Sequence, residues 1–191
     1  MNRSRTALTA LALVPVLALG ACSGDDPEPK LAPPPSSTAP SSPSTTAVSG
    51  PVAPTMPAAA RGDDAAAAEA FVKFYWEMVN YAQVTGDVDG LKALASRCGT
   101  CDAAVDYIAN VYERGGHIRG GEGRFRDLRA NFLVREGRPR ALVRGDLVST
   151  RQRVDLPGSK KDESYPGGTL PFEVLVEVTS DGWVVLTMGK Q

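Results

Sequence analysis

The sequence has few of the side chains from which metal sites and hydrolytic sites are usually built. It contains one histidine, His117, and three cysteines among 191 residues. A structural zinc ion takes about four nitrogen, sulfur or oxygen ligands, so we predict no metal site and no cofactor. A Ser-His-Asp triad is defined by geometry, and nothing in the sequence brings a serine and an aspartate to His117. We therefore assign no catalytic residue. The sequence leaves open whether the protein is an enzyme and favours a non-enzymatic role.

Long apolar runs and a strong excess of one charge are also missing. Residues 7–19 form an apolar run interrupted by Thr9 and Pro15, which is shorter than the ~20 residues that a membrane-spanning helix needs. The formal net charge is -1, which argues against general binding to nucleic acid. The glycine-rich segments 115–116 and 120–123 bracket a predicted strand and do not open a helix, so neither forms a phosphate-binding loop.

The N-terminal segment has the features of an export signal. Arg3 and Arg5 precede the apolar run, which ends in Leu-Gly-Ala-Cys at residues 19–22. A charged start followed by a short apolar stretch and small residues is typical of secretory signal peptides. The four residues also resemble the bacterial lipobox, in which the cysteine receives a thioether-linked diacylglycerol and becomes the mature N-terminus. The resemblance implies a signal peptide over residues 1–21 and a lipid on Cys22 that anchors the protein to the cell membrane on its extracytoplasmic face. The alternative is an ordinary secretory signal with an unrelated cysteine.

The next stretch has no apolar periodicity and is dense in proline, serine, threonine and alanine. Such a tract buries too little apolar surface to offset the entropy lost on folding. We therefore predict a disordered tether over residues 22–62, which begins with the lipidated cysteine, and a single domain over residues 63–191. Roughly 130 residues are enough for one hydrophobic core.

The first half of the domain follows a helical period. The first predicted helix, residues 64–85, has Asp63 or Asp64 as its N-cap. A short second helix carries Leu91 and Leu94, and a third covers residues 101–114. The first helix has one apolar stripe, formed by Phe71, Phe74, Tyr75, Met78 and Ala82. Together with Trp76, the aromatic part of this stripe forms the core face of the helix or lines a ligand pocket.

From Gly116 the apolar period changes to two, which is typical of half-buried strands. The predicted strands cover residues 117–119, 128–135, 140–154, 172–178 and 183–188. We expect tight turns at residues 136–139 and 181–182, a long mobile loop over residues 157–168, and a bulge near Arg126 and Asp127. The sequence therefore predicts an α+β fold in which three N-terminal helices pack on one curved antiparallel sheet of four to five strands.

Cys98 and Cys101 lie at the start of the third predicted helix. A lone pair of cysteines in an exported domain predicts a disulfide bond. A redox-active pair is one alternative, because the N-terminus of a helix lowers the pKa of a thiol, although thioredoxin-like motifs follow a strand in a βαβ unit. A metal site is the other alternative, and His117 does not complete its ligand set.

Charge is divided unevenly along the domain. Residues 62–113 carry nine acidic and three basic side chains, whereas residues 114–153 carry eleven arginines and four acidic side chains. Guanidinium groups pair well with phosphate and carboxylate. We therefore predict a surface for an anionic partner that includes Arg129, Arg135, Arg140 and Arg144. The alternative is a solvated sheet face whose charges pair with acidic neighbours and block edge-to-edge aggregation.

Several motifs, taken together, resemble known proteins. Three helices followed by a bent antiparallel sheet are similar to the nuclear-transport-factor-2-like (NTF2-like, cystatin-like cone) architecture. An uncharacterised family of actinobacterial lipoproteins resembles this chain over residues 64–190 and in the lipobox and tether. The motifs that carry the resemblance are Phe71-Val72-Lys73-Phe74-Tyr75, Asn80-Tyr81-Ala82, Thr85-Gly86-Asp87, Cys98-x-x-Cys101 and Gly115-Gly116. The resemblance implies a fold and a location. It carries no catalytic residue, because the family has no assigned activity.

Two functional hypotheses follow from these observations. The first is a non-catalytic binding module in the cell envelope, held at the membrane through Cys22. Its partner would be an envelope protein or an anionic wall polymer, and no nucleic acid. The second is a cone-fold enzyme or small-ligand carrier with an internal apolar pocket. A pocket that holds a convergent carboxylate would distinguish the enzyme hypothesis from the hypothesis of a non-catalytic binding module.

Overall fold

The computed structural model describes residues 50–159 and 162–191. The helices of this part are the 3-10 helix η1 (Ala58–Arg61), α1 (Ala65–Thr85), α2 (Asp89–Leu94) and α3 (Gly99–Glu113). The strands are β1 (His117–Gly120), β2 (Gly123–Arg135), β3 (Arg138–Ser149), β4 (Gln152–Asp155), β5 (Glu163–Tyr165), β6 (Gly168–Thr179) and β7 (Gly182–Lys190).

Local sequence signals account for the first helix. The Oδ1 atom of Asp64 accepts a hydrogen bond from the backbone N–H of Ala67 at 2.8 Å, which caps the N-terminus of α1. Gly86 ends the helix in a left-handed conformation with φ 78°. The predicted apolar stripe is buried along the whole helix. The positions predicted for the three helices are confirmed to within a few residues.

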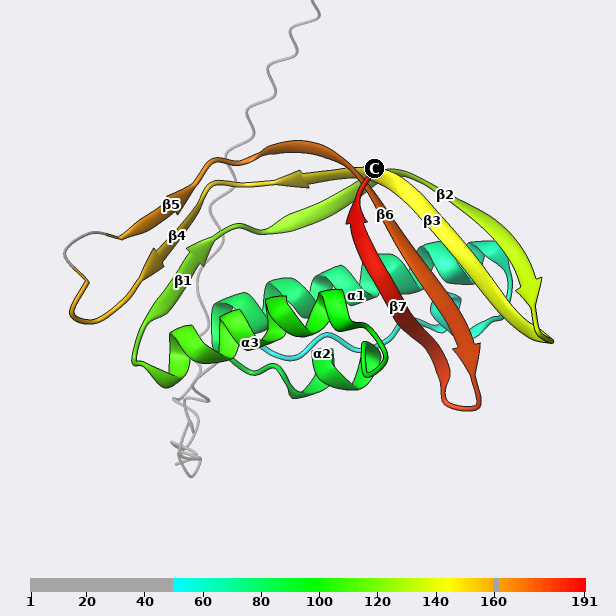
Figure 1. Ribbon diagram of the computed structural model, residues 1–191, viewed down its shortest axis with the longest axis horizontal. Coiled ribbons are helices and arrows are strands. Elements are labelled where there is room, and N and C mark those ends of the chain that lie inside the picture. The colour runs from blue at the N-terminus through cyan, green and yellow to red at the C-terminus, as the bar shows by residue number, and fades with distance from the viewer. Residues whose placement is uncertain (1–49, 160–161) are drawn as a thin grey trace, which may run out of the picture. The chain divides into compact units, whose positions relative to one another are not determined.

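The strands form two antiparallel sheets. One has four strands in the order β2-β3-β6-β7, and the other has three in the order β1-β4-β5. In Figure 1 the two groups of strands lie at opposite ends of the domain, and α1 and α3 run beneath them. Helix α1 contacts β1, β2 and β3, whereas α3 contacts β1 and β7. The prediction of three helices packed on one sheet of four to five strands, and of an NTF2-like cone, is therefore wrong.

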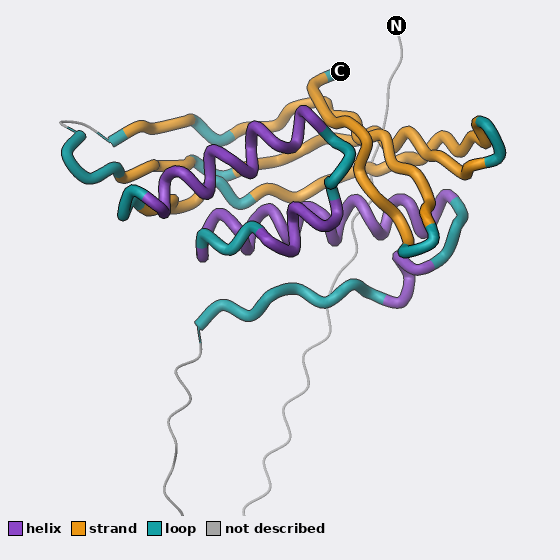
Figure 2. The backbone as a smooth tube through the Cα atoms, turned by 60° about the horizontal axis from the view of Figure 1, so that its bottom comes forward, coloured by secondary structure: helices purple, strands orange, loops and turns teal. Residues whose placement is uncertain are grey.

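The separation into two sheets has a cause in the backbone. The breaks lie between β1 and β2, between β3 and β4, and between β5 and β6, where short loops separate the strands (Figure 2). At Gly120, with φ 67°, an added β-carbon would lie 2.2 Å from the carbonyl oxygen of Arg151. At Gly167 it would lie 2.6 Å from the carbonyl oxygen of Ser149. Only glycine permits such close backbone approach. Strand β1 ends at Gly120, and β6 begins directly after Gly167.

The same breaks explain which strands the sequence pattern missed. Residues 140–154 were predicted as one strand, but they form most of β3 and most of β4. Residues 157–168 were predicted as a loop, yet they contain β5. All three residues of β5 are exposed, so no alternation of apolar and polar side chains marks this strand. The predicted bulge is confirmed by a register shift between Arg126 and Arg129.

The core lies between α1 and the inner face of the four-stranded sheet. Val143, Val174 and Val176 are fully or almost fully buried on this face. The ring of Trp183 stacks on Phe71 with 6.5 Å between ring centroids. The opposite face of this sheet is thus free of the core and carries the charged side chains described below.

Candidate functional site

One face of the four-stranded sheet is lined with arginine. In the pairing of β2 with β3, Arg129 lies opposite Arg144 and Arg135 lies opposite Arg138. Opposite residues of an antiparallel pair project to the same side, as do alternate residues along a strand. Ala141 of β3 is buried and faces the core, so the arginines face away from it. We call this surface the arginine face; its members are Arg129, Arg135, Arg138, Arg140 and Arg144. All four arginines predicted to meet an anionic partner thus lie on one face.

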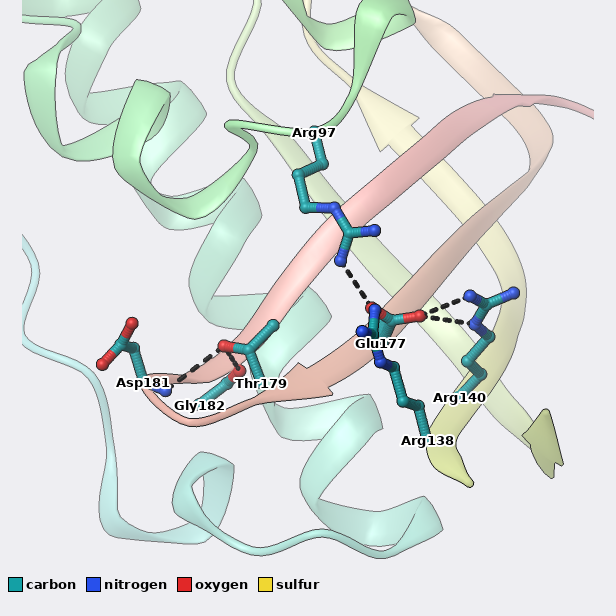
Figure 3. A network of polar contacts seen from close by, with 7 residues as sticks. All are labelled: Arg97, Arg138, Arg140, Glu177, Thr179, Asp181 and Gly182. Atoms are coloured by element: carbon teal, nitrogen blue, oxygen red, sulfur yellow. Dashed lines mark hydrogen bonds and ion pairs between the residues drawn. The ribbon is translucent and has the colours of Figure 1, made fainter. Parts of the chain in front are cut away.

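A buried carboxylate organises one end of the arginine face. Glu177 of β6 has a relative exposure of 0% and lies opposite Arg140. Its Oε2 atom accepts a hydrogen bond from Nε of Arg140 at 2.6 Å, and its Oε1 atom accepts one from Nη1 of Arg97 at 2.6 Å. Nη1 of Arg138 lies 3.4 Å from the same Oε1 atom (Figure 3). Three guanidinium groups, two from β3 and one from the connection between α2 and α3, therefore converge on one carboxylate.

Glu177 is held in its ionised form. Burial disfavours the charge, but hydrogen bonds and positive charge from Arg140 and Arg97 outweigh burial and hold the pKa of the carboxyl group below its usual value. An ionised carboxylate accepts hydrogen bonds and has no proton to donate. Its chemistry therefore suits the fixing of arginine side chains rather than general acid catalysis.

A polar cleft opens beside these three arginines. Its volume is about 430 Å³, and the turn between β2 and β3, the end of β6, Arg97, Arg138 and Glu177 line it. The Arg97 and Arg138 side chains are 48% and 58% exposed. Each guanidinium has five N–H donors, and Glu177 accepts only some of them. The remaining donors are available to a phosphate or a carboxylate in the cleft.

The turn between β6 and β7 borders the cleft and is fixed by its own hydrogen bonds. The hydroxyl of Thr179 donates to the carbonyl oxygen of Gly182 at 2.9 Å and accepts from the backbone N–H of Asp181 at 3.3 Å (Figure 3). These bonds hold the two strands together at the tip of the hairpin. Glu177 is thus presented from a rigid element.

The other predicted arginines have different surroundings. Nε of Arg144 donates to Oε2 of Glu173 at 3.0 Å. Nη1 of Arg129 donates to the carbonyl oxygen of Leu128 at 2.8 Å. Arg135 is exposed and forms no ion pair with the residues that the structure describes. The arginine face therefore combines paired and unpaired cations.

Sequence reasoning missed three members of the cluster. Arg97 lies 80 residues before Glu177, so no local pattern connects them. Arg138 lies in the predicted turn at residues 136–139. One signal was present in the sequence: Glu177 is an acidic residue in a strand whose alternate positions are valines. Its position opposite Arg140 becomes apparent only when β3 and β6 are aligned.

The predicted aromatic stripe has two roles. Phe71 and Phe74 are buried in the core. Tyr75 and Trp76 line a separate apolar pocket of about 210 Å³ between the helices and strands of both sheets. No aspartate, glutamate or histidine lines this pocket. The described residues thus give it no carboxylate of the kind that the enzyme hypothesis requires.

Cys98 and Cys101 form a disulfide bond, as predicted. Cys98 is the N-cap residue of α3, and both cysteines are buried. The bond therefore closes the first turn of the helix and holds the connection from α2 against it. Among residues 50–159 and 162–191 no group of three or more His, Cys, Asp or Glu side chains is arranged to hold a metal ion.

The predicted signal peptide, Cys22 and most of the tether lie outside the described residues. Within the described part, no helix combines the length and apolar character needed to cross a membrane.

Comparison with known proteins adds a family and a fold. A model described as "Family of unknown function (DUF6318)" matches residues 39–188. None of the curated proteins compared with the chain matches it. Among solved structures, the chain is similar to the intermembrane space region of the chloroplast protein ARC6, with a TM-score of 0.52 and 18% identity over 66% of this chain and 95% of that one. At this identity the similarity shows a shared fold and carries no activity across.

Proposed function

Because the chain belongs to the family of unknown function DUF6318, its role has to be argued from its own residues, and we propose that it is a lipid-anchored binding module of the cell envelope. The proposed anchor is a diacylglycerol on Cys22, with the domain on the extracytoplasmic face of the membrane, as in the actinobacterial lipoproteins that the chain resembles. The proposed act is non-catalytic binding of an anionic partner at the arginine face.

The convergence of three arginines on Glu177 is the observation that carries this proposal. One guanidinium is enough to neutralise one carboxylate, so a purely structural ion pair needs a single arginine. Here Arg97, Arg138 and Arg140 surround Glu177. The three guanidinium groups carry more positive charge than one carboxylate neutralises, and they repel one another at short range. Binding of an anion in the adjacent cleft relieves this repulsion, which favours a recognition role over a structural one.

The chemistry of the cleft indicates the chemical class of the partner. Two half-exposed guanidinium groups at its wall suit a phosphate or carboxylate group, which they can bind in bidentate geometry. Arg129, Arg135 and Arg144 extend the positive surface along β2 and β3. The extended surface favours a partner with several anionic groups, such as an anionic wall polymer or the acidic surface of an envelope protein.

Reversing charges on the arginine face is expected to weaken binding of a polyanion. We choose Arg129→Glu/Arg135→Glu, because neither residue touches Glu177. Titration calorimetry of the full chain with polyphosphate and with polyglutamate should show at least roughly tenfold weaker binding for this double variant, about 1.4 kcal/mol. Binding by the natural chain should also weaken as salt rises, because exposed charges are screened.

The matched control is Arg114→Glu/Arg151→Glu, which changes net charge by the same amount away from the arginine face. Unchanged binding by this control supports the arginine face as the site. Equal loss in both double variants would show that net charge alone matters, and it would contradict the proposal. Preference for polyphosphate or for polyglutamate distinguishes a phosphate-bearing partner from an acidic protein.

The proposed anchor predicts a covalent lipid at one cysteine. Cells expressing the full chain and fed an alkyne fatty acid should incorporate the label into the natural chain and not into Cys22→Ser. Cys98→Ser/Cys101→Ser is the control and should keep the label, because its lipobox is intact. Labelling of Cys22→Ser at the natural level would rule out this anchor.

A further inference from the structure

The apolar pocket between the helices and the sheets is a second feature that the arginine face does not use. Its volume is about 210 Å³. Its walls come from three helices, from β1 and β4 of one sheet and from β7 of the other. The lining side chains include Tyr75, Trp76, Gln83, Ala104, Tyr107 and Ile108. Ala104 and Tyr107 of α3 are exposed, so the pocket reaches solvent beside α3.

Tyr75 brings an unpaired hydroxyl group to this apolar lining. The residue has a relative exposure of 1%, and its hydroxyl makes no hydrogen bond to any residue that the structure describes. Among the described residues no fully buried side-chain oxygen or nitrogen lacks a hydrogen-bond partner, so this unpaired hydroxyl reaches solvent-accessible space. A neighbouring pocket wide enough for a ligand is the place where this hydrogen bond can be completed.

Gln83 adds a second polar group on the same helix, eight residues after Tyr75. Its side chain is 8% exposed, and its Oε1 atom accepts a hydrogen bond from Nε2 of Gln152. Its own Nε2 atom has no hydrogen-bond partner among the described residues. Two residues that line the pocket, Tyr75 and Gln83, thus each carry a donor group without a hydrogen bond to the described residues.

The donor character of Tyr75 is secure. Burial and the negative charge of Asp102 raise the pKa of its phenol well above its usual value, so the hydroxyl keeps its proton. No charged side chain lines the pocket. A charged ligand would lose its hydration there without gaining an opposite charge.

We propose that this pocket binds a small uncharged molecule with an apolar body of about one ring and one carbonyl or ether oxygen. The oxygen accepts a hydrogen bond from the hydroxyl of Tyr75, and the ring lies against Trp76 and Ile108. The size fits, since an apolar protein cavity of about 150 Å³ is large enough to bind benzene. This ligand is independent of the anionic partner, because the pocket shares no lining residue with the polar cleft.

Three probes of similar shape test the proposal. Acetophenone carries the carbonyl oxygen, ethylbenzene lacks it, and benzoate carries a negative charge. NMR spectra of the full chain should show that millimolar acetophenone shifts the indole N–H signal of Trp76 and the side-chain amide signals of Gln83. Benzoate should bind at least roughly tenfold more weakly than acetophenone, because its charge is not compensated.

Tyr75→Phe isolates the hydrogen bond, since it removes only the hydroxyl. It should weaken acetophenone binding about five- to tenfold, the worth of one hydrogen bond between neutral groups, and leave ethylbenzene binding unchanged. Ala104→Phe, at an exposed position of α3, should block the opening and abolish binding of both compounds. The proposal is overturned if no probe shifts these signals, if benzoate binds as well as acetophenone, if Tyr75→Phe binds acetophenone like the natural chain, or if Ala104→Phe has no effect.

Discussion

Glu177→Gln is expected to lower the midpoint of thermal unfolding by on the order of 10 °C. The substitution keeps the shape of the side chain and removes its charge. Arg140, which is only 17% exposed, then loses its compensating anion, as do Arg97 and Arg138. Removing one partner of a buried ion pair is strongly destabilising because the other charge stays behind. Thermal unfolding followed by circular dichroism measures the effect.

The same residue makes stability depend on pH. In the unfolded chain the pKa of Glu177 returns to about 4.5, whereas in the folded protein it is lower. A lowered folded pKa contributes stability that is fully present above pH 4.5 and is lost as the pH falls through the folded value. The natural chain should therefore lose stability below pH 4.5, and its difference from Glu177→Gln should shrink over the same range.

Glu173→Gln is the matched control for both experiments. It lies on the same strand and face and pairs with Arg144, but the two side chains are 37% and 42% exposed. Exposed ion pairs contribute about 0–1 kcal/mol, so this variant should be nearly as stable as the natural chain. An equal effect of both substitutions would show that the burial of Glu177 does not determine its contribution to stability.

Gly120→Ala is expected to destabilise the domain by about 2–4 kcal/mol. The position has φ 67°, and the added methyl group would meet the carbonyl oxygen of Arg151 at 2.2 Å. A backbone atom cannot move aside like the end of a flexible side chain, so the junction between the two sheets must shift. Denaturant unfolding of the purified full chain provides the free energy of unfolding.

Gly137→Ala separates the two causes of this effect. Gly137 has a similar φ of 74°, but nothing lies within 4 Å of its added β-carbon. Only the conformational strain remains there, and a loss of about 1 kcal/mol is expected. If Gly120→Ala costs no more than Gly137→Ala, close backbone approach is not what divides the strands into two sheets.

Elements whose signals lie within one segment were predictable. The apolar stripe of α1, its cap at Asp64 and its end at Gly86 are all local, and each was found in place. The alternation along β6 and the bulge after Arg126 are local as well. The disulfide between Cys98 and Cys101 joins residues three positions apart, so the sequence also contained that contact.

The candidate site was only half predictable. The excess of arginine over residues 114–153 was enough to select Arg129, Arg135, Arg140 and Arg144 as a surface for an anionic partner, and the pairing of β2 with β3 places them on one face. Nothing local to the sequence brings Arg97 to Glu177, because the α2–α3 connection and β6 meet only in the folded chain. The unpaired hydroxyl of Tyr75 was equally hidden, since a helical stripe has the same pattern whether it meets a core or a pocket.

By itself, the sequence determined the three helices, most of the strands, their order and the charge that they carry, because helical and strand periods are properties of neighbouring residues. The tertiary structure decided that the strands divide into two sheets, that three arginines share one buried carboxylate, and that one tyrosine faces a pocket. Each of these features depends on the distance between segments far apart in the chain. Packing sets such distances, and the close approach of Gly120 to Arg151 is one example. This packing produces no periodic pattern in the sequence.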